Sequence, residues 1–76
     1  MSWNYRVIRS PLEATSLGIH EVYYDEEGRP SSWTEEPCGA VGDNLLELRA
    51  EVQYMMEAFE RPVLRIVDGN KLEEET

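Results

Sequence analysis

The sequence has one cysteine and one histidine in 76 residues, and this scarcity excludes several kinds of site. A single thiol, Cys38, cannot form an internal disulfide, and it fits a reducing cytoplasm, where free thiols are ordinary. Cys38 and His20 are the only soft metal ligands, which is too few for a structural zinc site with its four ligands. We therefore expect no metal, no cofactor and a cytoplasmic location.

Basic residues and long apolar runs are also scarce. Seven Lys and Arg residues stand against 16 Asp and Glu residues, which gives a net charge of −9. Nucleic-acid binding needs a basic footprint, and anionic membrane surfaces attract basic segments, so we expect neither partner. No run is apolar enough to span a bilayer, and the first residues lack the apolar core of a signal peptide. A basic protein partner is compatible with this charge, and so is solubility alone.

The chain is short enough to limit its own stability. A chain of this length forms one domain at most and buries only about 60% of the surface that its unfolded form exposes. Small domains of this kind commonly gain stability from a disulfide, a metal or a partner. Since the first two are not expected here, we predict a homodimer or another protein partner.

Three segments have the composition of β-strands. Residues 3–9 alternate between two faces, and residues 17–24 are rich in β-branched and aromatic residues. Residues 25–30 have the composition of a hairpin loop, in which Gly28 can adopt positive φ. Residues 31–35, centred on Trp33, predict a short third strand.

The strongest periodic signal predicts one helix after these strands. Asp43 is a good N-cap, and Arg61-Pro62 ends the pattern. Apolar residues recur between them at spacings of three and four, namely Leu45, Leu48, Val52, Met55 and Phe59. We expect Leu45 and Val52 to be core positions. Residues 1–62 are thus predicted to form a single α+β domain, a three-stranded antiparallel sheet with one helix packed on one face (βββα).

The last residues predict less regular structure. Residues 63–67 are apolar enough for a C-terminal edge strand or for an arm that docks on another subunit. Residues 68–76 are polar and acidic, which is typical of a disordered tail.

One helix can cover only one face of a small sheet, and neither face of this one is cleanly polar. We place Trp3, Tyr5, Val7, Val22 and Tyr24 against the helix, and Ile8, Ile19 and Tyr23 on the open face, with Arg6 near Glu21. Large aromatic side chains are enriched at interaction hot spots, although they also fill cores. The candidate interaction residues are Trp3, Ile8, Ile19, Tyr23 and Trp33.

The residues capable of catalysis do not form a constellation. His20 and Glu21 are neighbours in a strand and therefore point to opposite faces. Cys38 has no adjacent base to lower its pKa. The carboxylates of residues 25–27 and 35–36 lack the spacing of a calcium loop. We therefore expect no enzyme.

Four motifs give the chain a resemblance to known proteins. Trp3-Asn4-Tyr5-Arg6-Val7, Ile19-His20-Glu21-Val22-Tyr23-Tyr24-Asp25, Gly28-x-Pro30 and Trp33-Thr34-Glu35 resemble the shared core of a family of small uncharacterised bacterial proteins, over roughly residues 3–62. That resemblance implies no activity. The order strand, strand, strand, helix is also similar in topology to HicB-type antitoxins, whose partial RNase H-like domain binds a small toxin.

Three functions are compatible with these observations. The first is a small acidic protein–protein interaction module that self-associates, as a homodimer formed through the uncovered sheet face or the C-terminal arm. The second is an acidic inhibitor or antitoxin-like protein that caps a basic enzyme surface, in a complex that salt weakens. The third is an enzyme, which would require a deep pocket with polar groups converging on His20.

Overall fold

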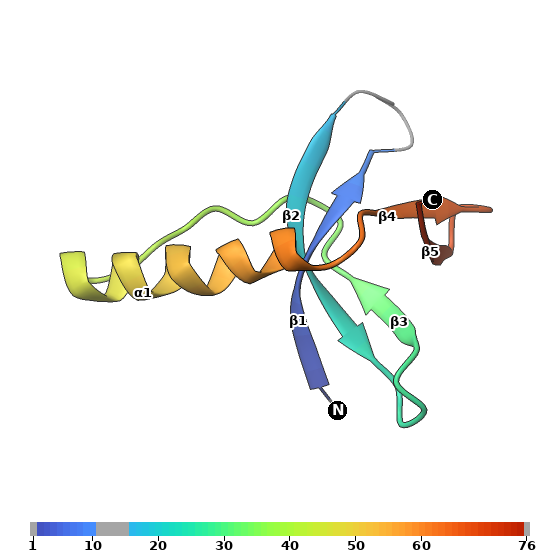
Figure 1. Cartoon of the computed structure of the whole chain (residues 1–76), viewed down its shortest axis with the longest axis horizontal. Helices are drawn as coiled ribbons and strands as arrows, with labels where there is room; N and C mark the ends of the chain where they lie inside the picture. Colours follow the sequence, from blue (N-terminus) through green and yellow to red (C-terminus); the bar gives the residue numbers. More distant parts are fainter. Residues whose placement is uncertain (1, 11–15, 76) are drawn as a thin grey trace.

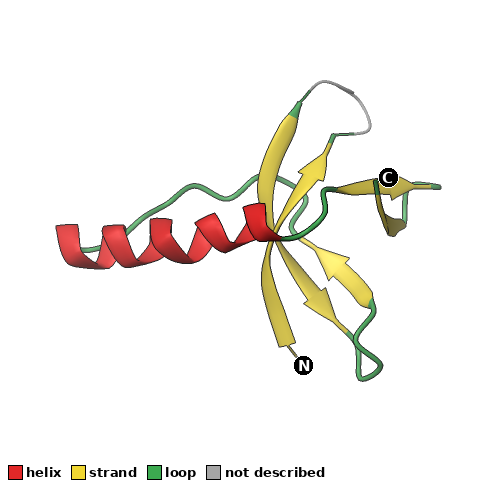
Figure 2. Cartoon of the chain, viewed as in Figure 1, coloured by secondary structure: helices red, strands yellow, loops and turns green. Residues whose placement is uncertain are grey.

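The computed structural model describes residues 2–10 and 16–75, and these form an α+β fold with one α-helix and a five-stranded sheet (Figure 1). Figure 2 shows that the helix follows the first three strands and precedes the last two. The elements in chain order are β1 (Ser2–Arg9), β2 (Leu17–Tyr24), β3 (Pro30–Trp33), α1 (Leu45–Met56), the 3₁₀ turn η1 (Glu57–Glu60), β4 (Leu64–Val67) and β5 (Lys71–Glu74).

The sheet is mixed, with the strand order β3-β2-β1-β4-β5. The three predicted strands are present and pair antiparallel, but the sheet has five strands rather than three. β4 lies parallel to β1, with Ile8 opposite Leu64, so it is an inner strand and not an edge. The 3₁₀ turn and Pro62 end the helix and return the chain to β1.

Residues 71–74, predicted to belong to a disordered tail, form the edge strand β5. Asp68 and Gly69 adopt φ values of 53° and 76°, which let the chain reverse tightly after β4. Leu72 then lies opposite Ile66 and packs against the core, and Arg9 forms an ion pair with Glu75 at 2.6 Å. Composition alone gives little weight to one leucine among acidic residues, but its packing, the pairing with β4 and the ion pair attach the strand to the sheet.

The sheet curls so that β3 contacts β5 at the opposite edge. The inside of the curl holds one of two core clusters, built on Ile8, Val22 and Leu64, each no more than 2% exposed. Half-buried side chains from the surrounding strands complete it, namely Tyr24, Trp33, Ile66 and Leu72. A sheet that covers one of its own faces in this way needs the helix on only one side.

The second cluster lies on the other face, where Tyr5 and Val7 meet Met55 and Ala58 of the helical segment. The sequence-based assignment of faces is therefore partly wrong. Residues directly opposite in an antiparallel pair share a face, and Val7 lies opposite Ile19 while Asn4 lies opposite Val22.

Four residues change face as a result. Val22 and Tyr24 lie inside the curl instead of against the helix. Ile19 and Tyr23 lie on the helix side instead of on the open face. Ile8 keeps its predicted face, away from the helix, but the curl closes that face and Ile8 is buried.

Arg6 is also placed differently from the expectation. It lies opposite His20 and not beside Glu21, and its side chain is buried. Its guanidinium donates to the Tyr24 hydroxyl at 3.0 Å and to the Pro62 carbonyl at 2.9 Å. These bonds join β1 to β2 and to the chain segment that enters β4.

The helix extends beyond the sheet instead of lying across it. Its first residues are far from the strands in Figure 1, and its contacts with the sheet come from the second half of α1, from Glu51 onwards, and from η1. The radius of gyration is 12.9 Å, compared with about 11 Å for a compact chain of this length. Among the described residues, the first half of α1 is therefore left without a strand against it.

Candidate protein-interaction surface

Local interactions start the helix without help from the sheet. The N-cap is Asn44, not Asp43 as predicted, and its side-chain oxygen accepts from the Glu47 amide at 2.9 Å. The Glu47 carboxylate in turn accepts from the Asp43 amide at 3.1 Å. This reciprocal arrangement satisfies amide groups that a helix start leaves unpaired, and the acidic side chain favours the positive end of the helix.

An aromatic and hydrogen-bonded contact attaches the helix to the sheet. The Tyr54 ring packs edge-on against Trp3 and Tyr5, with centroid distances of 5.6 and 5.2 Å. The Tyr5 hydroxyl donates to the Glu51 carboxylate. Burial, followed by this bond to an anion, raises the pKa of Tyr5 well above its ordinary value, so the phenol keeps its proton and remains a donor. This contact sets which side of the helix faces the sheet.

The apolar periodicity of the helix lies largely outside that contact. We define the apolar stripe as Leu45, Leu48, Val52, Met56 and Phe59. With 3.6 residues per turn, residues at these spacings lie on one side of the helix. The 3₁₀ turn η1 aligns Phe59 with Met56, three residues earlier. Of the periodic residues identified in the sequence, only Met55 is buried.

Leu45 and Val52, predicted as core positions, are 81% and 41% exposed, and Phe59 is 63% exposed. The physical reason is that Tyr54, Met55 and Ala58 provide the contacts with the sheet, and the stripe lies to one side of them. Val41 and Leu46 add two more highly exposed apolar side chains near the start of the helix. A large apolar surface is thus uncovered in the single chain.

An apolar hollow lies where the stripe meets the sheet. It has a volume of about 390 Å³, and its lining combines both strands of the first hairpin with the end of the helical segment: Val7, Leu17, Gly18, Ile19, Ala58, Phe59, Arg61 and Val63. Arg61 is the one cation of the lining. Because Phe59 belongs to both features, the hollow continues the stripe onto the sheet.

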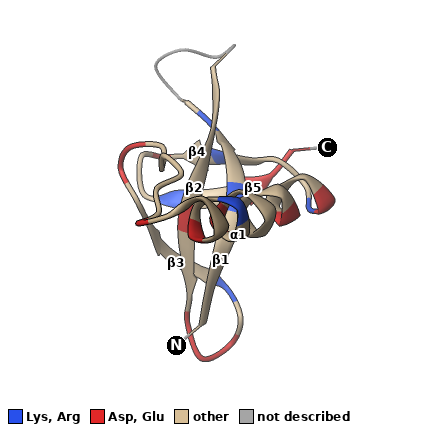
Figure 3. Ribbon diagram, turned by 90° about the vertical axis from the view of Figure 1, so that its left-hand side faces the viewer, with Lys and Arg blue, Asp and Glu red and all other residues tan. Residues whose placement is uncertain are grey.

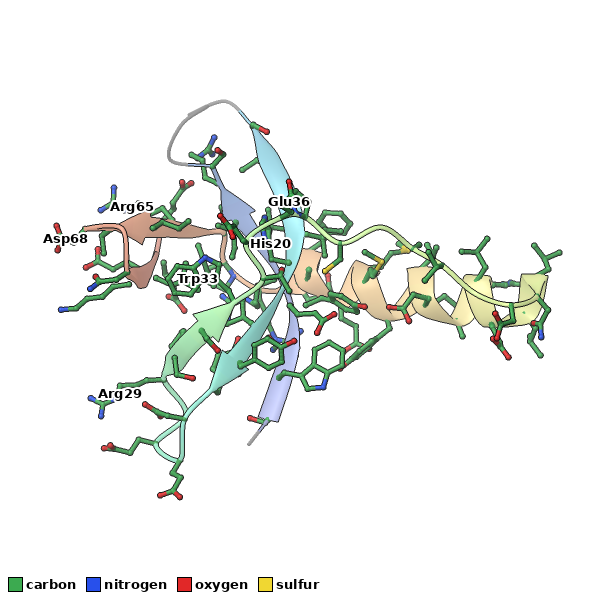
Figure 4. The ribbon with its side chains drawn as sticks, turned by 180° about the vertical axis from the view of Figure 1, so that it is seen from behind. His20, Arg29, Trp33, Glu36, Arg65 and Asp68 are labelled. Atoms are coloured by element: carbon green, nitrogen blue, oxygen red, sulfur yellow. The ribbon has the colours of Figure 1, made fainter. Side chains whose placement is uncertain are left out.

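The single histidine lies at a second hollow, of about 330 Å³, on the other face of the sheet. His20 is 7% exposed, and its Nδ1 donates to the Thr34 carbonyl at 2.9 Å, because a carbonyl oxygen can only accept. Figure 4 shows His20 and Glu36 at the loop that follows β3. The histidine ties this loop to β2.

The groups around His20 do not form a catalytic arrangement in the described part of the chain. Glu35 and Glu36 line the hollow, but both are exposed carboxylates. The Thr34 hydroxyl lies 3.4 Å from Nδ1, the ring nitrogen that already donates to the Thr34 carbonyl, so the imidazole is not placed to activate it. The contacts of the Cys38 thiol are with Thr34 and Glu21, at 3.8 and 3.9 Å.

The five residues predicted for interaction do not share one surface. Trp3, 40% exposed, and the half-buried Tyr23 lie on the helix side, with ring centroids 6.4 Å apart. Ile19 lines the apolar hollow. Ile8 is buried inside the curl, and Trp33 packs there too, pointing towards β4 and β5 in Figure 4.

Four stripe residues, Leu45, Leu48, Val52 and Phe59, belong to the periodic face that the sequence analysis placed against the sheet, and Met56 takes the place of Met55. One signal was available, because Leu46 adds an apolar residue outside the periodic face, and a helix that is apolar on more than one side has more than one neighbour. The period itself does not distinguish a neighbouring sheet from a neighbouring chain.

Acidic residues are spread over several elements of the described chain. Figure 3 shows them in loops and turns and on the helix, and they include the Asp25–Glu27 turn, where backbone amides of Arg29 and Glu27 lower the pKa of Asp25. Within the described residues, no group of three or more His, Cys, Asp or Glu side chains is arranged to hold a metal ion. The described part of the chain also has no helix with the length and apolar character needed to cross a bilayer.

Comparison with known proteins identifies no relative: no family model, no curated protein and no solved structure matches the chain. The resemblances drawn from the strand motifs and from the order of elements therefore remain predictions.

Proposed function

We propose that this chain is a protein–protein interaction module that self-associates through the apolar stripe of α1. The observation that carries this proposal is the exposure of the chain's strongest apolar periodicity, with Leu45 81% and Phe59 63% exposed. Monomeric proteins rarely leave a contiguous apolar patch beyond about 300–600 Å² in water. A second chain that covers the stripe removes this cost.

The stripe is exposed from one end of the helical segment to the other. Four of its five residues are exposed, namely Leu45 (81%), Val52 (41%), Met56 (56%) and Phe59 (63%). Because successive helix residues are about 100° apart, Leu46 and Tyr54 lie on other sides of the helix and do not belong to this surface. A second chain on the stripe would cover these four residues. Covering them would also contribute the stability that a small domain otherwise lacks.

In this proposal the chain binds and does not catalyse. The hydrogen bond of the His20 imidazole supports a binding role, because this bond to Thr34 attaches a loop to β2 and so has a structural explanation. The absence of a Cys38–His20 contact among the described hydrogen bonds supports it as well.

The charge of the chain gives the second candidate function, an acidic inhibitor that caps a basic enzyme surface. The net charge of −9 is the observation that favours it. The two proposals differ in the sign of their salt dependence. Two copies of a strongly acidic chain repel each other, so added salt should tighten apolar self-association, whereas it should weaken a complex with a basic partner.

Light scattering from the purified chain tests the proposal across a concentration series at two salt concentrations. We expect the mass to rise from 8.8 kDa, that of one chain, towards twice that value, at lower protein concentration in the higher salt. A mass of one chain at every concentration would exclude self-association. It would leave the acidic inhibitor as the remaining proposal, to be tested by the loss of a complex on addition of salt.

A further inference from the structure

We infer that two copies of this chain pack their α1 helices antiparallel, with the two-fold axis beside Val52 and the start of each helix seated in the apolar hollow of the other copy. This inference rests on the proposed function, because it takes the apolar stripe as the contact surface and specifies the partner and the arrangement.

The spacing of the stripe residues is symmetric about Val52. Leu48 and Met56 each lie four residues from Val52, and Leu45 and Phe59 each lie seven residues from it. In an antiparallel pair centred on Val52, Leu45 therefore faces Phe59 of the second copy, and Leu48 faces Met56. A two-fold interface needs this self-complementarity, since each contact must occur twice.

The shape of the chain favours the antiparallel direction. The first half of α1 extends away from its own sheet, and in Figure 1 the segment between β3 and α1 runs along one of its sides while no strand of the described chain lies beside it. An antiparallel partner places its own sheet beside this half of the helix, and each sheet then covers the exposed start of the other helix. In a parallel pair both sheets lie at the same end, and the exposed Leu45 and Leu46 have only the other helix as a neighbour.

The apolar hollow gives the start of the partner helix a place to bind. Leu45 of the second copy would arrive beside Phe59, at the border of the hollow that Val7, Leu17 and Ile19 line. The hollow measures about 390 Å³, enough for more than one aliphatic side chain, and Leu46 is exposed next to Leu45. Both apolar surfaces are then covered by the same arrangement.

Charges at the border of this contact are complementary. Arg61 lines the hollow, and its guanidinium donates one hydrogen bond to the Glu57 carbonyl at 3.1 Å, which leaves further N–H groups directed elsewhere. The helix start that would approach it carries Asp43 and Glu47. In a parallel pair, Arg61 of one copy would instead lie at the end that carries Arg61 of the other.

Disulfide cross-linking of engineered cysteines distinguishes the two directions. All variants carry Cys38→Ser, which removes the native thiol. Leu45→Cys chains and Phe59→Cys chains are mixed in equal amounts, at a concentration where light scattering shows each to be dimeric, and are then oxidised. Disulfides form only between residues whose Cα atoms approach within about 7 Å. The arrangement gives cross-links between position 45 and position 59 as the dominant product.

Two further single variants complete the test. Val52→Cys should cross-link to itself, whereas the adjacent Gln53→Cys, on a different side of the helix, should not. Cross-links of 45 to 45 and of 59 to 59 in dimeric samples would show a parallel pair, which overturns the arrangement and leaves the proposed function standing. A dimeric mass without a Val52→Cys cross-link would overturn both the antiparallel arrangement and the proposed function. A monomeric mass of the unsubstituted chain would also overturn both.

Discussion

Replacement of Val52 by aspartate is expected to convert the proposed dimer into a folded monomer. Val52 is 41% exposed in the single chain, so a carboxylate at this position can be solvated there at little cost to the fold. In the dimer it would enter an apolar contact beside a second copy of itself, and an unpaired charge is expensive to bury. A penalty of at least about 3 kcal/mol corresponds to a loss of affinity of more than about 100-fold.

Light scattering and far-ultraviolet circular dichroism together check this result. Gln53→Asp provides the matched control, because it introduces the same charge one residue along, on a different side of the helix, and should leave the mass unchanged. If Val52→Asp unfolded the chain at every concentration, the helix would pack inward, as the sequence pattern alone suggests. If the variant stayed dimeric, the stripe would not be the contact surface.

Truncation of Leu64 to alanine is expected to cost about 3 kcal/mol of unfolding free energy. Leu64 is 2% exposed, lies opposite Ile8 in the β1–β4 pair, and packs with Ile8 and Val22 inside the curl of the sheet. Large-to-small changes at such sites cost about 2–5 kcal/mol, through lost burial and the cavity left behind. Proteins have only about 5–15 kcal/mol in total, so the loss is a large fraction for a domain of this size.

Urea unfolding in the monomeric Val52→Asp background measures this cost without a contribution from association. Leu46→Ala makes the same chemical change at an exposed position and is expected to stay within about 0.5 kcal/mol of its parent. A Leu64→Ala value as small as that of Leu46→Ala would contradict the docking of β4 on β1, and with it the closure of the curl.

Local patterns in the sequence locate the first half of the fold well. The predicted second strand, residues 17–24, matches β2 residue for residue, and the first starts within one residue of β1. Alternation and turn composition act over a few residues, so they are visible without the rest of the structure. The helix is recognised for the same reason, from its cap and its spacing.

The assignment of faces could not be made in this way, because it depends on the register between two strands. One hairpin register places Val7 opposite Ile19, and this single choice moves Val22 and Tyr24 away from the helix. A one-residue change of register exchanges the two faces of a strand. The parallel pairing of β4 with β1 is likewise a long-range contact, and the sequence of residues 63–67 does not predict it.

The surface that we assign to interaction could not be predicted from the sequence for a different reason. A period of three and four residues indicates that one side of a helix is covered, but it does not identify what covers it. Leu45 and Val52 are exposed in the single chain and do not belong to either core cluster. The same pattern that marks a core in one protein can therefore mark an interface in another.

The most direct test of the stripe as a contact surface is the solvent accessibility of its methyl groups, measured by NMR with a soluble paramagnetic relaxation agent. The Leu45 and Val52 methyls should be shielded from the agent in concentrated samples and become accessible on dilution. The Leu64 methyls, buried inside the curl, should stay shielded throughout. If Leu45 and Val52 were equally accessible at all concentrations, the stripe would face water and the proposed function would be wrong.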